Sequence, residues 1–153
     1  WEELDERHGF AVLEPDRMKS GRTRRQRWHK PLGREALAIT QSLRESSLRS
    51  EWVFPSYVKQ GSPISDPKKA LYAVRDRSGL ATITIHDLRR TYITAMESLE
   101  VTGHQQAALV DHSPPGITSK YAGRISEDML ATLAGTQQRI EDHLLNLAGK
   151  ESA

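Results

Sequence analysis

Two stretches near the start of the chain have the apolar pattern of short β-strands. Residues 10–13 read Phe-Ala-Val-Leu, and residues 26–32 read Gln-Arg-Trp-His-Lys-Pro-Leu. A turn signal, Ser20 followed by Gly21, lies between them, so we expect an antiparallel hairpin. Because proline has no backbone N–H, Pro31 should lie at an edge or an end of its strand.

The apolar positions then change to helical spacing. Residues 34–48 predict a helix, because Ala36, Ile39 and Leu43 recur at steps of three and four along one face. Leu37 and Leu48 fit that face less well.

Two further helices are marked by their ends. Pro67 favours a first helical turn, and the helix that it opens should run to about Ser78 and end at Gly79. Thr84 is a predicted N-cap, with the acid Asp87 three residues later as in a capping box. The apolar residues that follow form one helical face, which we expect to face the core: Ile85, Leu88, Tyr92, Met96 and Leu99.

The last third of the chain is also predicted to be helical. Gly103 breaks the preceding pattern, and residues 104–110 suit a short helix. Ser126 is a predicted cap for a further helix, which Gly135 would interrupt. An apolar stripe continues from there at steps of four and three: Ile140, Leu144 and Leu147. The stripe suits either packing on the chain's own core or docking onto a second copy.

Composition fits this outline and removes several classes of site. A length of 153 residues suits one domain with a hydrophobic core, so residues 1–153 are expected to form a single domain. There is no cysteine, which excludes disulfides, thiolate zinc sites and a cysteine nucleophile. No apolar run approaches the roughly 20 residues that span a bilayer, so no membrane association is expected.

Charge is concentrated in one segment. The net charge is only +2, but residues 17–34 contain eight Lys or Arg and no acid. Such a block suits the phosphate backbone of DNA, although a solvated basic loop is an equal alternative on this pattern alone. Six cations are candidates for binding the DNA backbone. Five belong to this block and Arg90 lies outside it: Arg22, Arg24, Arg25, Arg27, Lys30 and Arg90.

An ordered set of polar residues carries the candidate chemistry. His86 and Arg89 form an H-x-x-R, His112 lies in a Val-Asp-His-Ser context, and Tyr121 follows. The successive gaps are 3, 23 and 9 residues. This order and spacing resemble the active site of the tyrosine recombinases, which include the phage integrases. The resemblance extends from Trp1 to about Leu147 and implies an α+β fold, mainly helical, with a small N-terminal antiparallel sheet.

The resemblance implies strand cleavage and rejoining through a 3′-phosphotyrosyl bond. Tyr121 would be the nucleophile and Arg89 a phosphate clamp, since a guanidinium binds two oxygens and stays charged. His86 would bind the phosphate or assist proton transfer, and His112 would hydrogen-bond the phosphate. Lys19, in Met-Lys-Ser-Gly-Arg, matches the context of the family's proton-donating lysine better than the second candidate, Lys30. No metal, ATP or other cofactor is needed.

Each residue also has a plainer interpretation. An isolated H-x-x-R is usually a cap histidine and a surface arginine, and most tyrosines are packing residues. The other tyrosines are weaker candidates for the nucleophile: Tyr92 belongs to the apolar face, and Tyr57 and Tyr72 precede the H-x-x-R.

The chain also departs from the family pattern. The segment Trp-Glu-Glu-Leu-Asp at residues 1–5 resembles one that follows the family's first arginine, so we expect a catalytic domain shortened at its N-terminus, with reduced activity alone. Asp111 stands where glycine usually precedes the second histidine, and Gly123 stands where a histidine often follows the tyrosine by two. These departures favour, as an alternative, a DNA-binding module with a decayed site. A type IB topoisomerase-like enzyme, which shares the chemistry, is a further alternative.

The resemblance also implies partners and a location. The expected partner is double-stranded DNA, on which copies of the chain would form a homo-oligomer through the C-terminal helix. A cytoplasmic, DNA-associated protein of bacterial or phage origin is expected.

Overall fold

A three-stranded sheet forms the N-terminal layer of the molecule. The computed structural model describes residues 1–14, 28–46, 50–110 and 126–149. Strands β1 (Leu4–Asp5), β2 (Phe10–Leu13) and β3 (Trp28–Pro31) lie in that order, and both pairings are antiparallel. The predicted strands and the position of Pro31, the last residue of an edge strand, are confirmed, whereas the predicted turn at residues 20–21 lies outside the described residues.

Helix α1 (Arg34–Glu45) follows the sheet directly. The predicted helix is confirmed, although it ends at Glu45 and not at residue 48, because Ser46 is extended. Its predicted inner face is partly wrong: Ile39 is 56% exposed, whereas Thr40 is buried and Leu37 is half-buried. Leu37 lies close to the sheet, because a Cβ built on Gly9 would lie 3.6 Å from Leu37 Cδ1. Of the three predicted positions, Ala36 and Leu43 are half-buried as expected, and only Ile39 faces away from the rest of the molecule.

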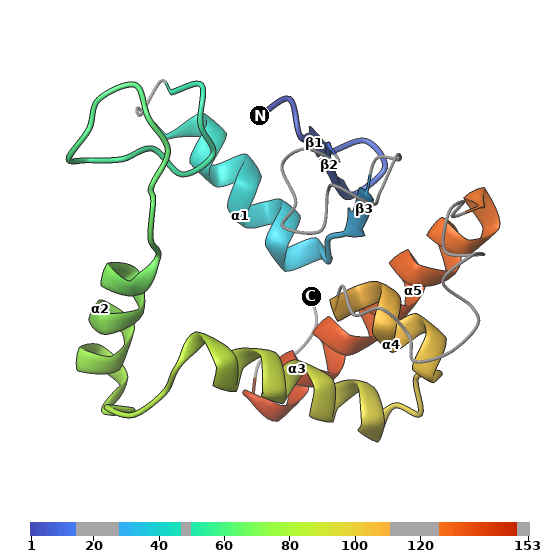
Figure 1. The fold of residues 1–153 in the computed structure, drawn as a ribbon. Helices are drawn as coiled ribbons and strands as arrows, with labels where there is room; N and C mark the ends of the chain where they lie inside the picture. The colour runs from blue at the N-terminus through green and yellow to red at the C-terminus, as the bar shows by residue number, and fades with distance from the viewer. Residues whose placement is uncertain (15–27, 47–49, 111–125, 150–153) are drawn as a thin grey trace.

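Helix α2 (Lys68–Ser78) lies at the edge of the molecule and is joined to the next helix by a short segment (Figure 1). Pro67 occupies its N-cap, and Gly79 ends it in the left-handed conformation, with a φ of 70°, as the sequence predicts. None of the described residues of α2 is buried, and Tyr72 and Val74 are about half exposed.

The hydrophobic core lies among three helices, α3 (Ile85–Ser98), α4 (Gly103–Val110) and α5 (Glu127–Leu147). Its buried members are Ala95, Met96, Val101, Leu109, Val110, Leu133 and Ile140. Leu144 packs against this core, whereas Leu147 is 72% exposed. The apolar stripe of α5 is therefore used for the chain's own core in its first two positions.

Two expectations about these helices are wrong. Gly135 does not interrupt α5, which runs unbroken from Glu127 to Leu147 because a single glycine weakens a helix without ending it. In α3, Ile85 and Leu88 do not face the core: they are 47% and 51% exposed. The buried part of the α3 face begins only at Tyr92, where α3 meets α4 and α5.

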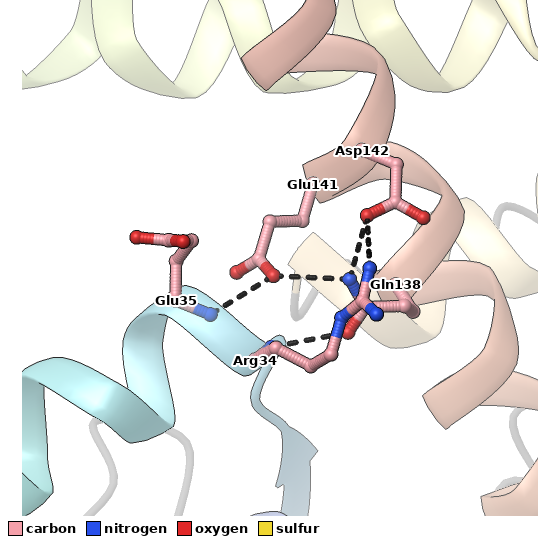
Figure 2. A network of polar contacts seen from close by, with 5 residues as sticks. All are labelled: Arg34, Glu35, Gln138, Glu141 and Asp142. Carbon is pink, nitrogen blue, oxygen red and sulfur yellow. Dashed lines mark hydrogen bonds and ion pairs between the residues drawn. The ribbon is translucent and has the colours of Figure 1, made fainter. Parts of the chain in front are cut away.

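A polar network joins α1 to α5 (Figure 2). The N-cap of α1, Gly33, has no side chain to accept a hydrogen bond, so the first free N–H groups of the helix need other acceptors. Gln138 Oε1 accepts from Arg34 N at 3.0 Å, and Glu141 Oε1 accepts from Glu35 N at 3.1 Å. The Arg34 side chain also donates to Asp142 at 3.0 Å. Helix α5 therefore caps α1 and fixes the position of β3, which leads directly into α1.

The architecture confirms a mainly helical α+β fold with a small N-terminal antiparallel sheet. None of the helices in the described part of the chain combines the length and the apolarity that a bilayer span requires.

Candidate active site

The start of α3 positions His86 and Arg89. Thr84 Oγ1 accepts from Asp87 N at 3.2 Å, and Asp87 Oδ2 accepts from Thr84 N at 2.9 Å, so the predicted capping box is confirmed. The hydrogen bonds from Thr84 lower the pKa of the Asp87 carboxyl, and the charges of Arg90 and His86 add to this effect. The acid therefore stays ionised at the positive end of the helix dipole. A helix that starts at a defined residue gives the two H-x-x-R side chains defined directions on its first turns.

Arg89 and Arg90 are used differently. Arg89 is half-buried, and its Nη2 donates to the carbonyl oxygen of Val110, the last residue of α4. Arg90 is exposed, and its Nη1 lies 3.8 Å from Asp87 Oδ1. It also lines a groove of about 330 Å³ between α3 and α5. His86 is exposed. The arginine of the H-x-x-R thus meets the end of α4, whereas its neighbour faces solvent.

Lys30 reaches the same helix end from the sheet. Its Nζ lies 3.0 Å from the carbonyl oxygens of both Ala108 and Leu109, and 4.6 Å from the centre of the Trp28 ring. Lys30 and Trp28 share one face of β3 because they are two residues apart. Lys30 from β3 and Arg89 from α3 therefore bring positive charge to the last three carbonyls of α4.

This convergence was not predicted from the sequence, although a signal for it is present. Residues 103–110 contain no Lys or Arg, and an acid, Asp111, comes next. A helix C-terminus carries partial negative charge and favours cations, each worth about 0.3–1 kcal/mol at exposed sites. A short helix that ends beside an acid and lacks a cation of its own needs one from another element.

The described tyrosines differ in their suitability as nucleophiles. The Tyr92 hydroxyl donates to Gln137 Oε1, and burial raises the pKa of Tyr92 to about 12. Because a phenol must ionise to attack phosphorus, Tyr92 is a poor nucleophile. Tyr57 is 85% exposed and Tyr72 is 49% exposed, and the helix that carries Tyr72 has no buried residue among those described.

The remaining predicted site residues lie outside the described residues. They are Lys19, Arg22, Arg24, Arg25, Arg27, His112 and Tyr121. Their roles stay predictions. What the structure brings together is Arg89, Lys30 and the end of α4, and the sequence places His112 two residues beyond that end.

Comparisons with known proteins agree with the sequence pattern. Residues 1–127 match the model of the phage integrase family. The chain is 31% identical over 111 residues to the prophage integrase IntF of Escherichia coli strain K12, and the match covers 72% of this chain and 23% of that protein. The chain thus spans about a quarter of the length of that relative. No solved structure matches.

Proposed function

The chain belongs to the phage integrase family, and on this basis we propose that it cleaves and rejoins DNA strands through a 3′-phosphotyrosyl intermediate in site-specific recombination. The supporting observation is the contact between Arg89 and the carbonyl of Val110. This contact brings together the H-x-x-R and the end of the helix that leads to His112, two motifs that are far apart in the sequence.

In this proposal Tyr121 gives up its phenol proton, with His86 assisting the transfer, and attacks the scissile phosphorus to form a phosphotyrosyl bond as the 5′ oxygen of the next nucleotide leaves. The transition state spreads negative charge over the phosphate oxygens, which Arg89, His86 and His112 stabilise. A guanidinium has five N–H donors, so binding one carbonyl leaves Arg89 with donors for a phosphate. Lys19 gives a proton to the leaving oxygen, and religation reverses the steps without ATP.

DNA is held by the basic segment and by Arg90. We assign phosphate contacts to Arg22, Arg24, Arg25, Arg27 and Arg90. Each contact releases condensed counterions, so affinity for duplex DNA should fall steeply as salt rises. An affinity that stayed constant from low to moderate salt would remove this assignment.

We also propose that copies of the chain pair on DNA through the end of α5. The residue of the apolar stripe that is most exposed is Leu147, at 72%. Leu147→Glu should therefore weaken the higher-order complex on DNA in gel-shift assays and leave single-copy binding intact. Loss of both complexes would argue against this surface.

The nucleophile is tested with nicked suicide duplexes, which trap a covalent intermediate. The protein is incubated with a pool of such duplexes, and denaturing gels are examined for a covalent protein–DNA band. We expect a band that Tyr121→Phe abolishes and that Tyr57→Phe, a matched change at an exposed tyrosine, leaves unchanged. A band that survives Tyr121→Phe would move the nucleophile elsewhere.

Two other outcomes correspond to other functions. Salt-dependent DNA binding without any covalent band would favour a non-catalytic DNA-binding module, which Asp111 in place of the usual glycine also favours. Relaxation of supercoiled DNA by unpaired copies would favour a type IB topoisomerase-like enzyme.

The rate of cleavage by residues 1–153 alone should be low. These residues contain no match to the family's first arginine, and loss of one such cation lowers rates by about 10²–10³-fold at comparable sites.

A further inference from the structure

The end of α4 has an unusual arrangement of charge. In the structure Lys30 Nζ lies 3.0 Å from the carbonyl oxygens of Ala108 and Leu109, and Arg89 binds that of Val110. All three carbonyls belong to the last turn of α4, where no later residue of the helix can donate to them. Both cations come from outside the helix, from β3 and from α3.

The sequence around this end explains why outside cations are needed. The negative end of the helix dipole disfavours an acid, yet Asp111 follows Val110 directly, and α4 has no Lys or Arg of its own. The last turn would therefore tend to fray without compensation. Lys30 supplies this compensation through two hydrogen bonds and a full positive charge.

We propose that Lys30 is a positioning residue for the end of α4, and that its ammonium binds protein carbonyls in place of a DNA phosphate. By holding the last turn, it fixes the point from which the chain leaves α4, two residues before His112 in the sequence. The part of this inference that concerns cleavage rests on the proposed recombinase function; the contact itself does not.

Two features of the structure separate this role from the DNA contact that the basic segment alone suggests. The Lys30 side chain is part-buried, between two carbonyls of α4 and the face of Trp28. The strand that carries it is also fixed at both ends: Trp28 pairs with Leu13, and Pro31 pairs with Phe10. The ammonium is therefore held toward α4 by a rigid element.

The contact is tested first without DNA. Amide hydrogen exchange at residues 108–110 reports opening of the last turn of α4. Lys30→Met should speed this exchange by about 2- to 30-fold, the range expected for losing one cation at a helix C-terminus. Lys30→Arg should retain slow exchange, because a guanidinium can also donate to these carbonyls. Lys59→Met, at an exposed lysine, serves as the control and should change nothing.

The role is tested next on DNA by measuring affinity as a function of salt. A lysine that neutralises a phosphate lowers the slope of log K against log[salt] by about one when it is removed. For Lys30→Met we expect an unchanged slope and a lower rate of covalent complex formation. The rate should recover in Lys30→Arg.

The outcomes distinguish this inference from the function on which it rests. Faster amide exchange at residues 108–110 in Lys30→Met, with an unchanged salt slope, supports the positioning role even if no variant cleaves DNA. If the unaltered protein does not cleave DNA, that result contradicts only the recombinase proposal. Unchanged exchange, or a slope reduced by about one, would overturn the positioning role. If Lys30→Met does not fold, Lys30→Gln replaces it, since the amide NH2 can still donate hydrogen bonds but carries no charge. This variant should show intermediate exchange, and exchange as slow as in the unaltered protein would overturn the role.

Discussion

The starts of α1 and α3 meet the same physical need in opposite ways. Each helix begins with N–H groups that have no partner within the helix. At α3, Thr84 and Asp87 satisfy them within one turn of chain. At α1, the acceptors are Gln138 and Glu141, which are 104 and 106 residues away from the amides that they accept from. A local cap stabilises one helix, whereas a remote cap also ties two layers of the molecule together.

The largest effect should come from removing the remote cap entirely. Gln138→Ala combined with Glu141→Ala should lower the free energy of unfolding by about 2 kcal/mol, since each lost cap acceptor costs about 1 kcal/mol. Chemical denaturation measures this loss, with Asn146→Ala on the exposed end of α5 as the control. A loss no greater than that of the control would mean that α1 does not depend on α5.

The local cap of α3 should contribute about half as much to the free energy of unfolding, and its contribution should not depend on the cap of α1. Thr84→Ala removes the acceptor for Asp87 N and should cost about 1 kcal/mol. Because the two helix starts share no partner, the cost of Thr84→Ala should add to that of Glu141→Ala within about 0.5 kcal/mol. A larger departure from additivity in this double-mutant cycle would contradict the contrast between the two ends.

A smaller effect tests how closely α5 approaches α1. A Cβ built on Gly33 would lie 2.2 Å from Glu141 Oε2, so Gly33→Ala should displace the carboxylate and cost up to about 1 kcal/mol. The same change in a Glu141→Ala background should cost almost nothing. Gly135→Ala provides a contrast, because its site in α5 is open and alanine favours a helix by about 1 kcal/mol. It should raise stability.

The smallest effects should appear as pH dependence. The pKa of Asp87 is lowered from 3.8 by Thr84, and that of Asp142 is lowered from 3.8 by Gln138 and then by Arg34. A carboxyl whose pKa is lower in the folded state stabilises the fold above its unfolded pKa and loses this contribution as pH falls through the folded value. Stability should therefore decline below about pH 4, and less so in Asp87→Asn. Carboxyl NMR titrations should also find the Asp87 pKa raised in Thr84→Ala but not in Gln138→Ala.

The contrast between the helix starts also explains what the sequence could predict. The start of α3 was predictable because Thr84 and Asp87 lie three residues apart. The remote cap of α1 and the contacts of Lys30 and Arg89 with the end of α4 could not be predicted, because the tertiary fold alone brings these partners together. The exposure of Ile85 and Leu88 was missed for a related reason: apolar spacing defines a face of a helix but not how far along it the neighbouring helices reach.

For the candidate site, too, one part could be predicted from the sequence and another part could not. Its residue types, order and spacing could be read from the sequence, and they suggested the same family whose model residues 1–127 match. The direction of each side chain could not. The sequence offered no reason to expect different surroundings for the adjacent Arg89 and Arg90, yet Arg89 binds the end of α4, whereas Arg90 is exposed and lines the groove between α3 and α5. The difference depends on where α4 lies, which no local pattern encodes.

The remote cap of α1 also bears on the order in which the chain can fold during synthesis. A ribosome adds about 5–20 residues per second, so about 5–20 seconds separate the appearance of Arg34 from that of Gln138. Throughout that interval α1 has a glycine at its N-cap and no acceptors from α5. The sheet and α1 therefore cannot reach their final stability alone. They must wait until α5 has emerged, so their stabilisation requires the synthesis of at least 104 residues after Arg34.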